Sequence, residues 1–298
     1  MKSSLVMRAM IGFYIFLFFL YLFGPLLVMS VTAFNTSSYP QAIPFEGFTL
    51  SWFPKLWNDR AMMEGLWNSV LIGFGVVALS VPVGLAAAII MSQIYHRARG
   101  IFYLVTISPV LTPGVIIGIS TVIFWKDMLE VTDWTKATFY KGVILSIFGQ
   151  ASFVSAYCLL IIMARLQRFD RAQEEAALDL GASYPQVFWH ILLPFLKPAL
   201  ISAAVIGFLS SFENYNTTTF AILADKTLVT VLAGQVRQGT TPALSALAVI
   251  IIGISLAGAI IYEVLKRREE ANAERAKERA KLAERGDDKL ATPLPSPA

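Results

Sequence analysis

The sequence predicts an all-α membrane protein in which six helices cross the bilayer. Its 298 residues are 56% hydrophobic and only 15% charged, and the mean hydropathy is +0.63. A soluble globular domain usually carries about 25% charged residues, so this composition excludes most soluble classes. The second observation is a series of stretches with few or no charges, each close to the ~20 apolar residues that a spanning helix needs.

The six predicted spans are separated by polar segments, and a charged tail follows the last of them. They cover residues 9–34, 65–91, 100–125, 142–164, 194–215 and 239–262. The first is longer than the apolar core of a signal peptide, which has about 7–15 residues, so we expect a retained helix. We therefore predict a transmembrane domain over residues 1–265 and a charged tail over residues 266–298. The proline-rich end of the tail is expected to be disordered.

The positions of lysine and arginine predict which side of the membrane each loop faces. With the N-terminus inside, 17 of the 24 Lys and Arg residues fall on the inner side, as expected for cytoplasmic loops. Nine of these 17 lie in the tail, and without them the inner and outer sides hold 8 and 7. The tail therefore decides the prediction that both termini are cytoplasmic.

Among the prolines inside the predicted spans are Pro82 in the second, and Pro109 and Pro113 in the third. Proline is tolerated at membrane depth where neighbouring helices satisfy the carbonyl groups that it frees. Such prolines either bend a helix around a pathway or have only a packing role, and the sequence leaves both interpretations open.

The inner segment between the fourth and fifth spans reads as a short helix, a corner and a second helix. Asp170 is suited to the N-cap position, with Gln173 three residues later to complete a capping box. Gly181 supplies the left-handed conformation that ends a helix. Ser183 and Gln186 repeat the start signal, so a second helix is expected to run into the membrane.

The short helix, residues 170–181, is predicted to be about 15 Å long. It is expected to expose three carboxylates beside two alanines, namely Glu174, Glu175, Asp179, Ala176 and Ala177. A small acidic knob on a flat alanine face is suited to docking in a pocket of another protein.

Seven residues of this segment have the spacing of a family motif. Glu175-Ala176-Ala177 is followed after three residues by Gly181, after nine more by Ile191, and after one more by Leu193-Pro194. At these positions the chain resembles the "EAA" loop of bacterial ABC importer permeases. The resemblance implies the type I ABC importer permease fold and a place in the bacterial inner (plasma) membrane.

In that family the short helix is the coupling helix, which inserts into a groove on a cytoplasmic ATPase. The resemblance implies that Glu175 contacts the ATPase and that Gly181 sets the bend, within a coupling surface that also includes Glu174, Ala176, Ala177 and Asp179. It implies as partners a second homologous permease subunit, a cytoplasmic ATPase dimer, a substrate-binding protein and membrane lipid, and no nucleic acid. The chain lacks Gly-x-x-x-x-Gly-Lys-Ser/Thr, so no cofactor is expected in it, and ATP and Mg are expected in the partner ATPase.

Weaker motifs bear on the substrate. Asn68-Ser69, Pro109, Pro113-Gly114 and residues 239–252 resemble the subfamily of spermidine/putrescine permease subunits. The resemblance covers nearly the whole chain and implies a polyamine or a related small amine. Related subunits carry ferric iron, thiamine, phosphonates or opine-like compounds, and these are the alternatives.

A carboxylate marks the end of the fifth span. Residues 198–212 rise only about 22 Å as a helix, short of a ~30 Å hydrocarbon core. Either the helix begins earlier, near Ile191, or Glu213 lies at membrane depth, where a carboxylate usually faces a cavity. The polar run that would line such a pathway is Glu213, Asn214, Tyr215 and Asn216. Polyamine permeases commonly show an acidic pair here, and Asn214 in place of the second acid argues against a di- or tricationic substrate.

Two other classes of function fit less well. A stand-alone secondary transporter predicts charged residues inside several spans and inverted repeats, whereas the sequence shows one marginal acid and no repeat. An intramembrane enzyme needs convergent His or Cys residues, but His96 and His190 lie at the inner boundary and Cys158 stands alone. We therefore predict no catalytic residue and no metal ligand.

Overall fold

The structure, a computed structural model, describes residues 5–131, 140–239 and 241–258, together with residues 260, 261, 263, 264 and 267. Within these residues every regular element is a helix, apart from one isolated bridge between Asn35 and Phe48. This confirms the predicted all-α class. Apart from Arg267, the predicted tail over residues 266–298 lies outside the described residues.

The chain divides into two compact units. One combines residues up to Leu56 with those from Thr241 onward, and the other runs from Trp57 to Thr240. The two ends of the described chain fall in one unit because residues near the first and last predicted spans pack on each other, and the predicted boundary at residue 265 stays a prediction. Ala33, Trp52 and Ala246 form one buried cluster.

The first unit contains α1 (Leu5–Ala33), most of α2 (Trp52–Trp57) and the helix Pro242–Gly258. A buried hydrogen bond of 2.7 Å joins Thr32 Oγ1 to Ser245 Oγ. The most apolar stretch of α1 has a mean hydropathy of 2.3, and the chain buries none of it. A helix that is apolar all round and uncovered is suited to a lipid environment.

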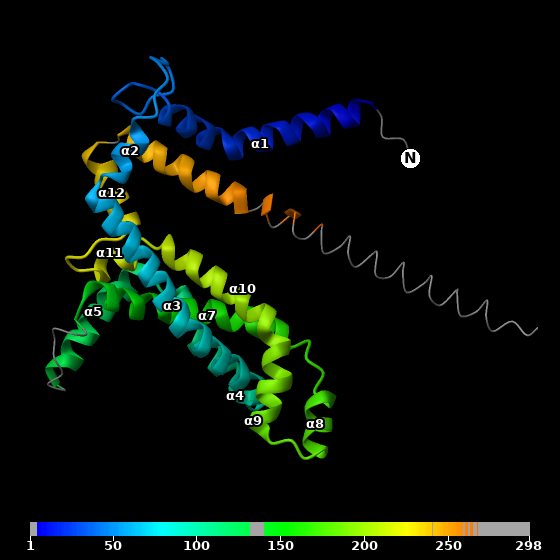
Figure 1. Cartoon of the computed structure of the whole chain (residues 1–298). Helices are drawn as coiled ribbons and strands as arrows, with labels where there is room; N and C mark the ends of the chain where they lie inside the picture. The colour runs from blue at the N-terminus through cyan, green and yellow to red at the C-terminus, as the bar shows by residue number, and fades with distance from the viewer. Residues whose placement is uncertain are drawn as a thin grey trace, which may run out of the picture. The chain divides into compact units, whose positions relative to one another are not determined.

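The centre of the second unit is formed by α3 (Arg60–Gln93), α7 (Gly142–Leu166) and α10 (Leu193–Phe212), which pack on one another (Figure 1). Their buried core includes Val76, Leu159 and Ala203. The contact between α3 and α7 is close because Gly84 has no side chain. A Cβ atom at Gly84 would lie 2.5 Å from Cys158 Cβ and 2.9 Å from the Leu159 backbone nitrogen.

Shorter helices occupy the two ends of this centre (Figure 1). One end carries α8 (Ala172–Asp179) and α9 (Tyr184–Val187). Near the other end lie α11 (Thr218–Ala221), which contacts α5 (Gly114–Val131) and α7, and α12 (Leu228–Gln238), which packs on α3.

Four of the described helices are long and apolar enough to cross a membrane, and a bent pair makes a fifth if the pair is counted as one span. The pair corrects the predicted third span: residues 100–125 are not one helix but parts of α4 (His96–Leu111) and α5, bent by 100°. Pro113 explains the break, because it has no N–H group and forces the preceding residue out of helical geometry. Thr112 accordingly has φ −83° and ψ 131°. Pro82, in contrast, lies inside α3 without ending it.

The fifth predicted span begins ten residues earlier than expected. Helix α9, a π-helical turn η1 (Phe188–Leu192) and α10 form one span of 29 residues, Tyr184–Phe212. In the π turn, the N–H of Leu193 donates to the carbonyl of Phe188, five residues back, immediately before Pro194, which has no N–H to donate. Twenty-nine residues make about 43 Å of helix, so this span is not short, and the earlier start that the sequence allowed is observed.

We expect Gly84→Ala to lower the stability of the purified protein by about 1–3 kcal/mol, because the new methyl group forces α3 and α7 apart. Thermal unfolding in detergent, followed by tryptophan fluorescence, measures the change. Gly100→Ala is the matched control, since no atom lies within 4 Å of a Cβ at that position. Equal unfolding temperatures for the two variants would contradict the close contact.

Candidate functional site

The short helix α8 begins after a turn, and a hydrogen bond within that turn stabilises it. The Asp170 carboxylate accepts a hydrogen bond of 3.0 Å from the N–H of Ala172. The residue before the first one of α8 is Arg171, one later than the predicted N-cap, but Arg171 has helical angles (φ −65°, ψ −21°) and makes no capping hydrogen bond with its side chain, so Asp170 supplies the side-chain cap as predicted. Helix α8 therefore has eight residues and a length of about 12 Å.

The end of α8 is a Schellman motif centred on Gly181. The N–H of Gly181 donates to the carbonyl of Leu178 (2.9 Å), and the N–H of Ala182 donates to that of Ala177 (3.0 Å). Gly181 has φ +87°, which confirms the predicted left-handed conformation, and nothing lies within 4 Å of a Cβ built there. The requirement for glycine is therefore conformational, not steric.

A capping box then starts α9, as predicted. The backbone N–H of Ser183 donates to Gln186 Oε1 over 2.7 Å, and the Ser183 hydroxyl lies 3.0 Å from the same oxygen. The chain direction between α8 and the long Tyr184–Phe212 span is thus fixed by Gly181 and this box.

Helix α8 buries none of its side chains. Glu175, Ala176 and Asp179 are exposed as predicted, but Glu174 and Ala177 are half-buried. The expectation that Glu174 is exposed is therefore wrong. Glu174 and Leu178 are four residues apart and share a face of the helix, and both line a cavity against the rest of the unit.

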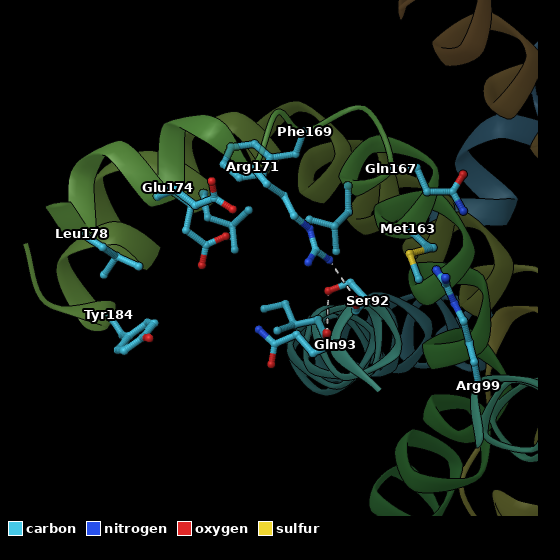
Figure 2. A pocket seen from close by; sticks show the side chains of 14 residues that line it. Ser92, Gln93, Arg99, Met163, Gln167, Phe169, Arg171, Glu174, Leu178 and Tyr184 are labelled. Atoms are coloured by element: carbon cyan, nitrogen blue, oxygen red, sulfur yellow. Dashed lines mark hydrogen bonds between the residues drawn. The ribbon is translucent and has the colours of Figure 1, made fainter. Parts of the chain in front are cut away.

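The cavity beneath α8 has a volume of about 440 Å³. Figure 2 shows Glu174 and Leu178 on one side and Gln93, from the end of α3, on the other. Its charged lining residues are Arg99, Arg171, Glu174 and Glu175. Arg171 crosses to α3, where its Nη2 donates to the Ser92 carbonyl oxygen over 2.9 Å (Figure 2).

Sequence reasoning did not identify two residues of this segment. Leu180 is 89% exposed, an apolar side chain at the tip of α8 beside Gly181. Arg171 was counted only as a positive charge. The signal for Leu180 was available, since it lies one position before the glycine that ends the helix, outside the face that packs.

The second candidate site is the corner between α10 and α11. Glu213 is the C-cap of α10 and is exposed, and no described side chain bonds its carboxylate. Asn214 has a structural role: its Oδ1 accepts the N–H groups of Thr217 (3.1 Å) and Thr218 (3.2 Å). The Tyr215 hydroxyl accepts a hydrogen bond from Arg237 (3.0 Å).

Asn216 is exposed, and its Cβ atom lies close to the first residue of α5. A Cβ atom at Gly114 would lie 3.0 Å from the Cβ of Asn216. Of the four predicted pathway residues, Glu213 and Asn216 thus present free side chains, whereas the oxygens of Asn214 and Tyr215 are engaged. Arg237, which the sequence did not bring forward, adds a positive charge beside Tyr215.

A buried glutamine fixes the position of this corner. Gln150, on α7, is only 1% exposed. Its Oε1 accepts a hydrogen bond from Ser211 on α10, and its Nε2 donates to Thr218 Oγ1 on α11 over 2.7 Å. Thr218 Oγ1 in turn lies 3.2 Å from Asn214 Oδ1. Two buried hydroxyls of the same elements, those of Ser146 and Thr217, find no hydrogen-bond partner among the described residues.

The contact between Gln150 and Ser211 also locates Glu213 relative to the length of α7. Gln150 is eight residues, or about 12 Å, beyond the start of α7 at Gly142. Ser211 contacts Gln150, and Ile222 lies against Gly142. Glu213, two residues after Ser211, therefore lies beside the first third of α7 and not beyond its end.

The sequence profile of one family matches residues 80–270, and its description is "binding-protein-dependent transport system inner membrane component". The chain belongs to this family. It is a permease component of an ABC importer and a multi-pass protein of the inner membrane.

Two relatives cover most of the chain. The putrescine transport system permease protein PotI of Escherichia coli strain K12 is 28% identical over 256 residues, which is 85% of this chain and 89% of PotI. The spermidine/putrescine transport system permease protein PotC of Haemophilus influenzae is 27% identical over 267 residues, covering 86% and 95% of the two chains.

Solved structures show the same fold at low sequence identity. A chain of a bacterial ABC transporter that imports the acidic polysaccharide alginate matches with a TM-score of 0.64 and 17% identity, covering 86% of this chain and 93% of that one. The same kind of transporter in complex with an alginate-loaded periplasmic protein matches with a TM-score of 0.62 and 16% identity, covering 86% and 92% of the two chains. These structures establish the permease fold and carry no information about the substrate of this chain.

We expect Gln150→Leu to destabilise the protein by about 1–3 kcal/mol, because the hydroxyls of Ser211 and Thr218 lose a buried partner. Thermal unfolding in detergent measures the effect. Gln167→Leu, at an exposed position, is the control. Unchanged stability of the Gln150 variant would show that the corner does not depend on this side chain.

Proposed function

We propose that the chain is the transmembrane permease subunit of an ATP-driven importer that receives its substrate from a periplasmic or extracellular binding protein. The observation that carries the proposal is α8, within the region matched by the family. It buries no side chain, it is fixed at its end by Gly181, and it presents Glu175, Ala176, Asp179 and Leu180 to solvent. A partner subunit that covers Leu180 would bury an apolar side chain that is otherwise 89% exposed.

The proposed topology has six spans and cytoplasmic termini. The four long helices and the α4–α5 pair account for five spans, and the helix Pro242–Gly258, about 25 Å long, accounts for the sixth. The excess of Lys and Arg supports an inner position for the α8 segment and for both ends of the chain.

The proposed assembly places ATP hydrolysis outside this chain. A dimer of cytoplasmic ATPase subunits binds ATP and Mg, with α8 docked on one of them, and a second homologous permease completes the pathway. This chain then contributes no catalytic residue of its own. The alginate transporter solved with its periplasmic protein supports a similar role for a binding protein here.

We propose a polyamine or a related small amine as the substrate. PotI and PotC, named for putrescine and spermidine, support this class, and so does Glu213. A carboxylate beside the first third of α7 is costly if it faces lipid, so the exposed Glu213 side chain is best accommodated in a pathway shared with the second permease. Arg237 and the absence of a second acid favour an amine of low charge. Ferric iron, thiamine, phosphonates and opine-like compounds are the alternatives.

Reconstitution tests the proposal. The chain is co-expressed with candidate ATPase, permease and binding-protein subunits from the same organism, and uptake of labelled putrescine into liposomes is followed with and without ATP. We expect co-purification of the ATPase and ATP-dependent uptake. Uptake by this chain alone, driven by an ion gradient, would instead show a secondary transporter.

Gly181→Val is expected to abolish import, because a β-branched residue resists the positive φ at this corner and α8 is then misplaced. Gly181→Asn is the matched variant, since asparagine tolerates left-handed angles, and it should retain most activity. Import and ATPase rates of equally expressed complexes are compared. Normal import by the valine variant would rule out a role for the corner in coupling.

Glu213→Gln is expected to weaken the engagement of a cationic substrate roughly five- to 150-fold, the range for loss of a charge-assisted hydrogen bond. The amide keeps the shape and removes the charge, so assembly and basal ATP hydrolysis should not change. Uptake of putrescine, spermidine and a zwitterion is measured for both proteins. Equal rates for every substrate would identify Glu213 as a boundary residue.

A further inference from the structure

We propose that Arg171 is a positioning residue that links the α8 segment to α3, so that a displacement of α8 reaches the centre of the second unit. The inference rests on the proposed docking of α8 on an ATPase. It concerns a different step, namely how movement of α8 is passed to the membrane helices.

The contacts of α8 with the rest of the unit lie mainly at its two ends. On the N-terminal side, the Phe169 ring lies 5.1 Å from the ring of Phe195 on α10. On the C-terminal side, Gly181 and the Ser183 capping box connect α8 to the continuous Tyr184–Phe212 helix, which contains α10. These connections lead to α10, and the short linker after Leu166 joins α8 to α7.

Arg171 supplies the connection to α3. Its Nη2 donates to the carbonyl oxygen of Ser92 over 2.9 Å, and Ser92 is the residue before the last one of α3. Carbonyl groups in the last turn of a helix lack an intrahelical partner and carry the negative end of the helix dipole. The Arg171 guanidinium group donates a hydrogen bond to one of these carbonyl oxygens, and its positive charge interacts favourably with the negative end of the helix dipole. No other hydrogen bond between residues 167–181 and α3 is present in the described part of the chain.

The cavity explains why this single bond matters. Between α8 and α3 lies the open space of about 440 Å³, lined by Glu174 and Leu178 on one side and Gln93 on the other (Figure 2). Because side chains do not fill this space, packing cannot transmit a movement of α8 to α3 across it. With the Arg171 bond intact, the N-terminal end of α8 is bonded directly to α3, whereas without it α8 reaches α3 only through α7 and α10.

The opposite end of α3 is joined to the loop after α11. Asn68 Nδ2 donates to the Lys226 carbonyl over 2.8 Å, and the hydroxyl of Ser69 accepts the N–H of Leu228 over 3.0 Å. Helix α3 is thus bonded near one end to the α8 segment and near the other to the segment that leads into α12. A movement imposed at Ser92 reaches residues 226–228 along one rigid element.

The test compares Arg171→Ala, Arg171→Lys and Arg168→Ala in the reconstituted complex. Arg168 is the matched control, because it is an exposed arginine three residues before Arg171. We expect Arg171→Ala to retain ATPase binding and basal ATP hydrolysis but to import roughly tenfold less substrate per ATP, as for loss of a charge-assisted hydrogen bond. Arg171→Lys, which keeps a cationic donor, should recover part of the loss, and Arg168→Ala should behave as wild type.

A second measurement reports the link without relying on uptake. Spin labels at Gln173→Cys on α8 and Gln93→Cys on α3, in a Cys158→Ser background, measure the separation of the two helices. We expect one narrow distance distribution with Arg171 and a broader one in the Arg171→Ala variant.

Two results would overturn the inference while leaving the proposed function intact. One is an ATP-driven wild-type complex whose Arg171→Ala variant has the same import per ATP and the same distance distribution. The other is loss of ATPase binding in that variant, which would assign Arg171 to the docking surface. Failure of the wild-type chain to bind an ATPase would instead contradict the proposed function.

Discussion

The close contact between α3 and α7 is the interaction on which the rest of the second unit depends. In a bilayer the hydrophobic effect does not drive helices together, so their association depends on close packing and on hydrogen bonds between them. Gly84 provides the first, because its lack of a side chain lets the backbone of Leu159 approach. The Ser80 hydroxyl, which donates to the Ala151 carbonyl, provides the second. Helix α10 packs against both members of this pair, and α8 and the α10–α11 corner are held at the ends of these helices.

The sequence predicts a conformation most accurately where that conformation depends only on neighbouring residues in the chain. Gly181 and the Ser183 capping box concern a few adjacent residues, and both have the predicted conformation. The 100° bend between α4 and α5 is a local effect of Pro113, but its size depends on what the two helices then pack against. A single sequence contains no such information, so it identifies the proline but does not choose between a bend and a continuous helix, as Pro82 shows.

The predictions that required tertiary contacts were less complete. Glu174 belongs to an acidic run that reads as exposed, yet the helix turns it toward the cavity. Asn214 reads as a pathway residue, but its oxygen caps the turn into α11. Gln150 connects three helices, and a lone amide in an apolar stretch gives no indication of its partners, because Ser211 and Thr218 are 61 and 68 residues away in the chain.

The π turn at Phe188–Leu192 determines how the side chains of α9 are rotated about the helix axis relative to those of α10. A π turn accommodates one residue more than an α turn, and each residue of an α-helix corresponds to a rotation of about 100° about its axis. The side-chain faces of α9 and α10 are therefore offset by one residue. Deleting a single residue here would favour a plain α-helix and turn α9, with the Gly181 corner and α8 attached, by about 100° relative to α10. The length of the polypeptide between Gly181 and Pro194 thus determines the direction in which α8 faces, even though no residue in that interval belongs to α8.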